Sequence, residues 1–569
     1  MLAEHISIAQ VNGAAHPSDR VAELDFNSLA HVRVVIINLP LRESARPNVP
    51  PQGPGLMAAR LRQYGADVSL IDLNGYRITD KISLDQGNQY GRHLTVVESE
   101  QLITAHFNKH GEPHIIGLSG MITTQRWQAA VAKICRRIAK QAFIISGGGL
   151  ATEIKGGLFD WIPELDAIGH SEGDDIILIC AAEVKRSGFN RDRMCGSPAY
   201  IGTVGGQPRW IYSGDRPKNL NALPFAAWDL LEEDVNGYQL LEDYIRTPVW
   251  GLGANNSSAT PFSMQRSLTT VSSRGCPHAC AFCYRGAQGE RNWGIRSPEN
   301  LRAEAEWMIQ TYGVDFIGFP DDNFAVDFKR CAALPRAFEG LNFRWGTHTR
   351  LDECTLNRLE PMAASGCVYI GVGAESASED TLVKMNKGGQ ILYKNGQKRM
   401  SRVGEFNFPT MMIEGVQNCH QLDIHVNATW MMAYPGETLR DLQVSVGFIL
   451  WQQELYTKGH TVGTPAFTAA VASVNRRMFT ATAYPGTAMF KDQKVQKLLT
   501  EHFGISFDRA GDPLCDIAFL QYVEELDDAT KVLVGANGKP LNWSEMPDEV
   551  FLEARRHVDN DQIEKILDM

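Results

Sequence analysis

Three cysteines close together in the sequence are the residues best suited to chemistry. Cys276, Cys280 and Cys283 are spaced CxxxCxxC, and Phe282 stands immediately before the last of them. Thiolates are the preferred ligands of iron–sulfur clusters, and a fourth thiolate would complete the ligation of a 4Fe-4S cube. Three thiolates in one turn therefore predict a 4Fe-4S cluster with one iron left open for chemistry.

Zinc and disulfides are the alternative uses of these cysteines. Zinc could take the three thiolates with His278 as a fourth ligand, but structural zinc sites usually pair two short ligand clusters, and no second CxxC or HxxxH follows. The other cysteines are scattered singly, as buried thiols in a reducing cytosol usually are. They are Cys135, Cys180, Cys195, Cys331, Cys354, Cys367, Cys419 and Cys515.

The composition is that of an ordinary globular protein, and its 569 residues predict two to four domains. The net charge of -11 and the absence of a basic block argue against a nucleic-acid partner. The first thirty residues have neither a basic nor an apolar signal region, and no apolar run approaches the ~20 residues that span a bilayer. We therefore expect no membrane span and a cytoplasmic protein.

From residue 31 the chain alternates strand-like and helix-like segments. Runs of β-branched and other apolar residues predict buried parallel strands. The alternation predicts an α/β fold with a doubly wound (Rossmann-like) sheet, whose ligands lie beyond the carboxyl ends of its strands. The predicted strands are 32–39, 67–73, 115–119, 142–146 and 165–168, and the predicted helices include 55–64 and 124–139.

Three glycines, Gly147, Gly148 and Gly149, directly follow one of these strands. Glycines at such a place let a backbone approach a ligand closely and expose amide donors, so the segment could cradle a nucleotide-like tail. A tight turn without a ligand is the alternative for glycines taken alone.

The CxxxCxxC spacing, with Phe282 in the penultimate place, resembles the radical S-adenosylmethionine (radical SAM) superfamily. In that family the open iron binds the methionine end of S-adenosylmethionine, and an electron from the cluster cleaves this cofactor to a 5'-deoxyadenosyl radical. The resemblance implies Cys276, Cys280 and Cys283 as the cluster ligands. It also implies an external electron donor of the flavodoxin or ferredoxin type.

The segments before the cluster motif resemble the cobalamin (B12)-binding domain fused ahead of many radical SAM enzymes. Ser119-Gly120-Met121 and Gly147-Gly148 look like its SxL and GG elements. The resemblance implies that Ser119, Met121 and the glycines 147–149 line the groove for the nucleotide tail, so that a leucine at Gly148 would block binding. Residues 38–40, 53–56 and 72–74 match the opening of that domain, and 169–174 match its GEGE turn loosely. Residues 220–229 match the LPxPAWDLL linker that joins it to the radical domain.

One departure from the cobalamin domains of the methionine synthase type concerns the lower ligand of cobalt. Those domains carry DxHxxG after the first strand, and residues 39–44 contain no such histidine. The resemblance therefore implies cobalamin without a histidine at that position. A cobalt without a strong lower ligand favours the Co(I) state, the nucleophile that methyl transfer from a sulfonium requires.

After the cluster motif, four segments fit strands of a partial (β/α)6 barrel: 315–319, 343–348, 368–372 and 427–433. Residues at the carboxyl ends of such strands converge on an active site. Five motifs of the radical SAM family follow in order: DDxF, TR, GxES, PGET and YPGT. The resemblance implies that Phe282, Asp322, Asn323, Arg350, Glu375 and Gly436 contact the cofactors. Taken singly, these polar residues could cap helices, and Arg350 could pair with Asp352.

Two segments have no counterpart among these motifs. Residues 390–408 add a polar stretch, for which a solvated loop is the expected structure and a clasp for an acidic substrate the alternative. Beyond residue 488 the chain is charged and helical, with a terminal helix expected over 548–569. In related enzymes such a tail covers the open side of the barrel.

The sequence is therefore interpreted as a cobalamin-dependent radical SAM enzyme, a methyltransferase that acts on an unactivated carbon of a small molecule or lipid. The alternatives are a cyclase or oxidoreductase with the same cofactors, a radical enzyme with a vestigial cobalamin domain, and a non-enzymatic iron–sulfur redox sensor. The catalytic residues stay unknown. The expected domains are an N-terminal extension at 1–30, the cobalamin domain at 31–185, a linker at 186–262, the radical SAM domain at 263–488 and a C-terminal region at 489–569.

Overall fold

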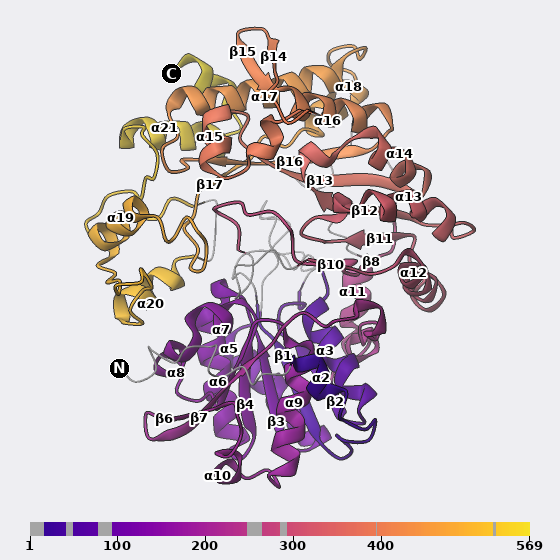
Figure 1. Ribbon diagram of the computed structural model, residues 1–569, viewed down its shortest axis with the longest axis vertical. Coiled ribbons are helices and arrows are strands. Elements are labelled where there is room, and N and C mark those ends of the chain that lie inside the picture. The colour runs from indigo at the N-terminus through magenta and orange to yellow at the C-terminus, as the bar shows by residue number, and fades with distance from the viewer. Residues whose placement is uncertain are drawn as a thin grey trace. The chain divides into compact units, whose positions relative to one another are not determined.

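The computed structural model describes residues 16–40, 49–77, 94–246, 264–284, 293–393, 395–526 and 531–569 (Figure 1). The chain divides into two compact units. Unit 1 comprises Met1–Arg246, Gly286–Glu290 and Ile505–Asp527, and unit 2 comprises Thr247–Arg285, Arg291–Gly504 and Asp528–Met569. Each unit contains one large sheet. Within the described ranges, no helix combines the length and apolar character that crossing a membrane requires.

Unit 1 is built on a seven-stranded sheet in the order β2-β1-β3-β4-β5-β7-β6. All neighbours pair in parallel except β6, which runs antiparallel to β7. The order reverses between β1 and β3, so the predicted doubly wound fold is confirmed. The strands are β1 (Arg33–Asn38), β2 (Asp67–Asp72), β3 (Ile115–Ser119), β4 (Phe143–Gly147), β5 (Ala167–His170), β6 (Tyr200–Val204) and β7 (Gln207–Ser213).

Helices cover both faces of this sheet, as expected when strands are apolar on both sides. The helix after β2 begins at a capping box. The Thr95 side chain accepts a hydrogen bond from the Glu98 amide, and the Glu98 carboxylate accepts one from the Thr95 amide. The main helices of unit 1 are α3 (Gln52–Gln63), α5 (Val96–His110), α6 (Gln125–Ile138), α7 (Gly149–Ile154), α9 (Gly173–Arg186), α10 (Arg191–Met194), α11 (Leu240–Arg246) and α20 (Ile517–Glu524).

The segment after α9 contributes more to unit 1 than a connector would. The strand pair β6 and β7, which lies in the expected linker, extends the sheet because β7 bonds to β5. Trp228, from the linker motif, is fully buried and packs over Gly55, where an added Cβ would lie 3.0 Å from its ring. The linker aromatic therefore stabilises unit 1 itself.

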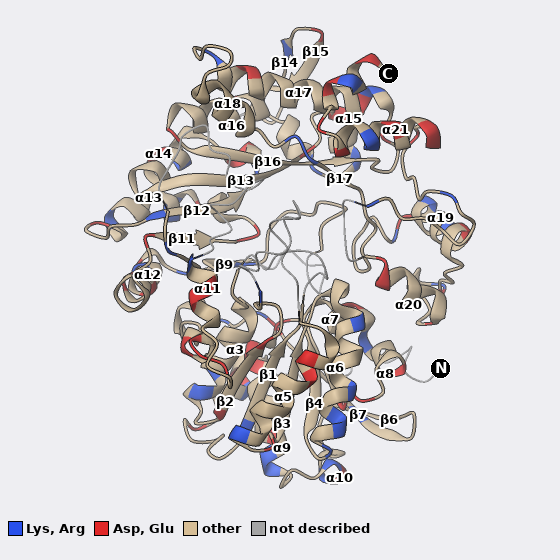
Figure 2. Cartoon of the chain, turned by 180° about the vertical axis from the view of Figure 1, so that it is seen from behind, with Lys and Arg blue, Asp and Glu red and all other residues tan. Residues whose placement is uncertain are grey.

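Unit 2 is built on a six-stranded parallel sheet in the order β17-β16-β13-β12-β11-β8, with helices between successive strands. The predicted partial barrel is confirmed. Its strands are β8 (Ser267–Thr269), β11 (Phe316–Phe319), β12 (Arg344–Thr349), β13 (Cys367–Glu375), β16 (His425–Met432) and β17 (Met478–Thr480). Its helices include α12 (Pro298–Tyr312), α13 (Phe328–Ala337), α14 (Leu356–Ala364), α15 (Glu379–Lys384), α16 (Thr410–Gln421), α17 (Leu439–Thr457), α18 (Pro465–Ala472), α19 (Gln493–Phe503) and α21 (Asp548–Asp559). Figure 2 shows largely uncharged strands in both units, with charged residues mainly on helices and loops.

The sheet of unit 2 has an apolar face and a polar face. Paired residues of parallel strands project to the same side, and Trp345, Ile370, Val372 and Trp430 share the side that packs against the helices. The opposite, inner face carries glycines and polar residues instead. The cluster loop follows β9 (Ser273–Arg274), which pairs with β10 (Gly294–Ile295).

The segment 390–408 is not the solvated loop that the sequence suggested. Within it begins a hairpin of β14 (Met400–Val403) and β15 (Phe406–Pro409). Phe408 is 1% exposed, and its ring lies 5.2 Å from that of Phe448 on α17. The polar residues around the hairpin hid the fact that alternate positions of β15 are apolar and bury against a helix.

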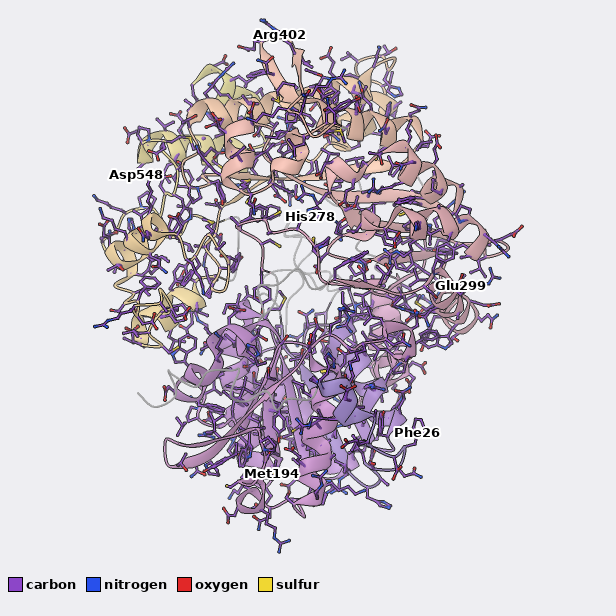
Figure 3. The ribbon with its side chains drawn as sticks, in the orientation of Figure 1. Phe26, Met194, His278, Glu299, Arg402 and Asp548 are labelled. Carbon is purple, nitrogen blue, oxygen red and sulfur yellow. The ribbon has the colours of Figure 1, made fainter. Side chains whose placement is uncertain are left out.

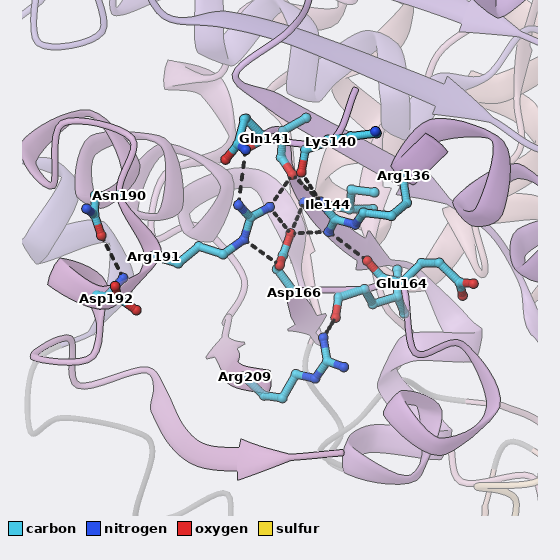
Figure 4. A network of polar contacts seen from close by, with 12 residues as sticks. Arg136, Lys140, Gln141, Ile144, Glu164, Asp166, Asn190, Arg191, Asp192 and Arg209 are labelled. Carbon is cyan, nitrogen blue, oxygen red and sulfur yellow. Dashed lines mark hydrogen bonds and ion pairs between the residues drawn. The ribbon is translucent and has the colours of Figure 1, made fainter. Parts of the chain in front are cut away.

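The amino ends of β4 and β5 are tied together by one buried carboxylate (Figure 4). Asp166 accepts from Arg136 of α6 at 2.6 Å, from Arg191 of α10 at 2.7 and 3.0 Å, and from the Ile144 amide at 2.8 Å. The guanidinium groups also donate to backbone carbonyls, including that of Ala142. This network fixes two helices against the amino edge of the sheet, opposite its carboxyl edge.

We expect Asp166→Ala to destabilise unit 1 by about 2 kcal/mol, because it leaves two half-buried arginines without their shared anion. Thermal melts followed by circular dichroism measure the loss. Lys140→Ala is the matched control, since only the backbone of Lys140 takes part in the network. Equal melting temperatures for the two variants would contradict this role for Asp166.

Candidate functional site

The loop that carries the three cysteines is held in place by backbone and side-chain groups of unit 2. The Ala281 amide donates to the Met385 carbonyl at 2.9 Å, and the Met489 amide donates to the Ala281 carbonyl at 2.8 Å. The Asn386 side chain donates to the Ala279 carbonyl at 2.6 Å. His278, labelled in Figure 3, lies 3.0 Å from Glu353. The loop is therefore fixed from several segments beyond the strand ends.

The three thiols lie close enough to influence one another. Burial raises the pKa of Cys276, and it raises the pKa of Cys283 to about 12, with Cys280 and Asp322 adding to the effect. A metal reverses such a shift, because coordinated thiols are deprotonated. In the described part of the chain, no three His, Cys, Asp or Glu side chains are arranged to hold a single metal ion. A cube does not require that arrangement, since each thiolate binds a different iron.

Arg350 follows β12 and reaches the cysteine loop. Its Nη1 donates to the Cys280 Sγ at 3.4 Å, while Nε and Nη2 donate to the two oxygens of Asp352 at 2.9 and 3.0 Å. Arg350 thus pairs with Asp352 and also lies at the cysteine loop, while its contact with a cofactor stays a prediction.

Asp322 lies shortly after β11, and Glu375 is the last residue of β13. The Asp322 side chain is accessible to solvent. The surrounding protein still removes part of the water around its carboxyl and so raises its pKa, and the nearby Asp321 carboxylate raises it further. Glu375 is 8% exposed and has a φ of 65°, a strained conformation for a residue other than glycine. Burial raises its pKa, which Lys387 opposes from 3.6 Å. Both carboxyls raise the pKa of Cys283, so they lie near the cysteine loop.

The other predicted contacts lie around the same strand ends. Asn323 is fully buried and accepts from Thr349 at 2.7 Å, which places it beneath the ends of β11 and β12. Gly436 has a φ of 78°, and its carbonyl accepts from Lys384. The Phe282 ring meets Tyr434 edge-on, with centroids 6.4 Å apart.

Asp321 is a residue that sequence reasoning missed. Its buried carboxylate accepts from the Ser272 amide at 2.7 Å, from the Ser272 hydroxyl, and from the Ser273 hydroxyl at 2.7 Å. The Arg330 guanidinium lies 3.8 Å from it. Asp321 therefore ties the end of β11 to the segment that enters the cysteine loop. Asp321 stands beside Asp322 in the sequence, but its serine partners lie far away along the chain.

We expect Asp321→Ala to lower the iron content of reconstituted protein, because the segment entering the cysteine loop loses its anchor and Arg330 loses its anion. Asp321→Asn should lie between this variant and the wild type. The control is Asp327→Ala, which removes the N-cap of α13 and costs about 1 kcal/mol without touching the loop. Iron and sulfide analysis decides: full loading of Asp321→Ala would refute the anchoring role.

A second candidate site lies at the carboxyl edge of the unit 1 sheet. Ser119 and Gly147 end neighbouring strands and are register partners, and the Gly120 amide donates to the Gly147 carbonyl at 3.2 Å. A Cβ on Gly147 would meet nothing within 4 Å. Gly148 differs: its φ is 91°, and a Cβ there would lie 2.2 Å from the Gly120 carbonyl oxygen. Gly147 faces open space, whereas Gly148 permits a close backbone contact.

The neighbouring predicted residues frame this open space. The Met121 side chain is 53% exposed, and Gly149 begins α7. His170 ends β5 at the same edge, is 2% exposed, and has no hydrogen-bond partner at Nε2. Burial lowers the pKa of His170 to about 4, so its imidazole is neutral. The segment 39–44 corresponds to the DxHxxG position, and only residues 39–40 of it are among the described residues.

Comparisons with known proteins agree with this arrangement. The model of the "Radical SAM superfamily" matches residues 270–449. An uncharacterized methyltransferase of Pyrococcus horikoshii is 23% identical, covering 82% of this chain and 84% of its own length. The cytidylyl-2-hydroxyethylphosphonate methyltransferase of Streptomyces wedmorensis is 23% identical over 70% of this chain and 72% of its own.

Two solved structures share the fold. The radical S-adenosylmethionine methyltransferase TsrM from Kitasatospora setae has a TM-score of 0.59 at 13% identity, covering 94% of this chain and 88% of its own. The cobalamin-dependent S-adenosylmethionine radical enzyme OxsB has a TM-score of 0.57 at 15% identity, covering 85% of this chain but 64% of OxsB, so the chain matches just under two thirds of that protein. Residues 270–449 therefore match the radical SAM superfamily, and the chain, with its CxxxCxxC loop, parallel half-barrel and doubly wound sheet, shares the fold of cobalamin-dependent radical SAM enzymes.

Proposed function

We propose that the protein is a cobalamin-dependent radical SAM methyltransferase that methylates an unactivated carbon of a small molecule or lipid. One observation carries this proposal: the chain combines a three-cysteine loop at the carboxyl ends of a parallel half-barrel with a doubly wound sheet that has an open glycine edge. The first part suits cleavage of S-adenosylmethionine, and the second suits a large cofactor with a nucleotide tail.

In this proposal the 4Fe-4S cluster supplies the electron that cleaves S-adenosylmethionine, and cobalamin supplies the methyl group. Cys276, Cys280 and Cys283 hold the cluster, and an external donor of the flavodoxin or ferredoxin type reduces it. We assign Asp322 and Glu375 to the methionine end of S-adenosylmethionine, an assignment that their nearness to the cysteine loop supports. The exposed Asp322 is open to a ligand, and the strain at Glu375 is typical of functional positions.

The inner face of the half-barrel supports a polar substrate. His348 is exposed on this face, and its ring lies over Gly371, where a Cβ would come within 2.4 Å of it. Asn427, in register with Gly371, donates to the Tyr369 hydroxyl at 2.8 Å. These side chains lie below the strand ends on the side away from the helices. The exposed His348 favours a substrate with a hydrogen-bonding group near the reacting carbon, and the buried Asn427 and Tyr369 line the face beneath it.

We further propose that the carboxyl edge of unit 1 binds cobalamin, with Ser119, Met121, Gly147 and Gly149 along its nucleotide tail. The open space at Gly147 is the observation that fits this group. The cobalt is expected to lack a histidine ligand, and His170 is the histidine to examine because its Nε2 is buried without a partner at the same edge. Cob(II)alamin-loaded protein tests this by electron paramagnetic resonance (EPR). A nitrogen splitting that disappears in His170→Ala would refute the absence of a histidine ligand.

A cyclase is the second candidate. The anaerobic magnesium-protoporphyrin IX monomethyl ester cyclase of Rubrivivax gelatinosus is 23% identical over 48% of this chain and 46% of its own length. Its match covers less of both chains than the match to the methyltransferase of Pyrococcus horikoshii. Methyl transfer is therefore the preferred proposal.

Isotope transfer separates the two functions. Anaerobic protein loaded with iron, sulfide and cobalamin is incubated with a reductant, S-adenosyl-[methyl-D3]methionine and a metabolite extract from a strain that lacks the gene. We expect a product that has gained one trideuteromethyl group in place of a hydrogen. A product that has lost hydrogen without gaining label would favour the cyclase. If the reductant causes no consumption of S-adenosylmethionine, the redox sensor is favoured.

A further inference from the structure

The guanidinium of Arg350 lies between a thiol of the cysteine loop and a carboxylate. It presents two N–H groups to Asp352 at 2.9 and 3.0 Å, and the remaining Nη1 donates to the Cys280 Sγ at 3.4 Å. Arg350 is 7% exposed, so little water screens the contact. The planar fork of arginine suits this double contact, since one edge is fixed by the carboxylate while another N–H points at the sulfur.

The backbone around the pair holds this geometry in place. Asp352 lies in the short 3₁₀ helix Leu351–Glu353, directly after Arg350. Gly389 leaves room for both side chains, because a Cβ there would lie 2.6 Å from the Asp352 Oδ2 and 3.1 Å from the Arg350 Nη2. The pair is thus packed against a glycine that no larger residue could replace without moving it. The contact with Cys280 is built into the fold.

Such a contact has a known electrostatic consequence. Reduction makes an iron–sulfur cluster more negative by one charge, and hydrogen bonds to its sulfurs and nearby positive charge stabilise the reduced state. A cationic N–H donor at a ligating thiolate therefore raises the reduction potential. A carboxylate bonded to the same cation partly cancels its charge and lowers the potential again.

We propose that Arg350 sets the reduction potential of the cluster through the Cys280 thiolate, and that Asp352 limits how much positive charge the cluster experiences. This inference rests on the proposed function, in which Cys280 is a cluster ligand. It gives Arg350 a role that is independent of any contact with S-adenosylmethionine. Arg350 is then a positioning and tuning residue that decides whether the flavodoxin- or ferredoxin-type donor can reduce the cluster.

The test is a redox titration of the reconstituted full-length protein, followed by EPR in the absence of S-adenosylmethionine. Arg350→Met removes the N–H donors and the charge at similar length, so the midpoint potential should shift to more negative values. Asp352→Asn keeps the shape but removes the opposing charge, so the potential should shift to more positive values. Arg350→Lys keeps the charge without the fork and should lie between Arg350→Met and the wild type.

Opposite shifts distinguish tuning from damage, because a disturbed loop would move both variants in the same direction. Arg358→Met is the control, since Arg358 bonds the Ala325 carbonyl and Thr355 instead of the cysteine loop. An unchanged potential in a fully loaded Arg350→Met protein, or equal signs for Arg350→Met and Asp352→Asn, overturns the inference. If Arg350→Met loads no cluster, the sign of the Asp352→Asn shift decides. A wild-type protein that binds no 4Fe-4S cluster refutes the ligand assignment itself, and the inference with it.

Discussion

Replacing any one of Cys276, Cys280 and Cys283 by alanine should abolish 5'-deoxyadenosine formation, because two thiolates cannot hold a cluster that already has only three protein ligands. Reconstituted wild-type protein should contain about four irons per chain, and each variant should fall to background. Iron and sulfide analysis, the EPR signal of the reduced cluster and chromatography of the S-adenosylmethionine products measure the three effects together.

The control for these variants is Cys195→Ala, because Cys195 is a half-buried thiol of unit 1, far along the chain from the cysteine loop. It should retain full iron content and activity. Zinc in place of iron in the wild type, with activity surviving the loss of all three cysteines, would show that the cluster assignment is wrong.

Gly147→Val should weaken cobalamin binding on the order of 100-fold while leaving unit 1 folded. A Cβ on Gly147 meets no atom within 4 Å, and valine suits the end of a strand, so the new side chain projects into the space proposed for the nucleotide tail. Equilibrium dialysis with cobalamin measures the affinity, and thermal melts without cobalamin measure the fold.

Gly148 provides the contrasting variant. Gly148→Ala places a Cβ 2.2 Å from the Gly120 carbonyl oxygen at a φ of 91°, so it should lower the melting temperature even without a ligand. Gly148→Leu, the change that the sequence suggests, therefore cannot separate binding from folding. Wild-type affinity in Gly147→Val would contradict the placement of the tail, and no binding by the wild type would favour a vestigial domain.

The strands were predictable because each is a short apolar run bounded by turn residues. All five strands expected in unit 1 and the four expected after the cluster motif are present, with boundaries shifted by a few residues. The alternation of strands and helices predicted a doubly wound sheet, but periodicity alone does not give the order of its strands. The sequence could not assign β7 to the main sheet, because a strand pair in a connector looks the same whether it stands alone or extends a neighbour.

The site was predictable where motifs are local and unpredictable where contacts join distant segments. The three cysteines stand in one loop, and their spacing is enough to predict a cluster. The bond from Asp321 to Ser272 joins residues far apart in the chain, and no pattern marks it. The contrast between Gly147 and Gly148 is likewise tertiary, because it depends on where the Gly120 carbonyl lies. The hairpin after residue 399 was missed because its buried phenylalanines are surrounded by polar residues.

One measurement tests the central claim, that two cofactor sites in one chain divide the use of S-adenosylmethionine. Anaerobic protein loaded with both cofactors is mixed with a reductant and S-adenosylmethionine, and S-adenosylhomocysteine and 5'-deoxyadenosine are quantified in the same sample. We expect the wild type to form both products, and Gly147→Val to form 5'-deoxyadenosine while losing S-adenosylhomocysteine. Formation of 5'-deoxyadenosine alone by the wild type, or equal amounts of S-adenosylhomocysteine from both proteins, would contradict the account.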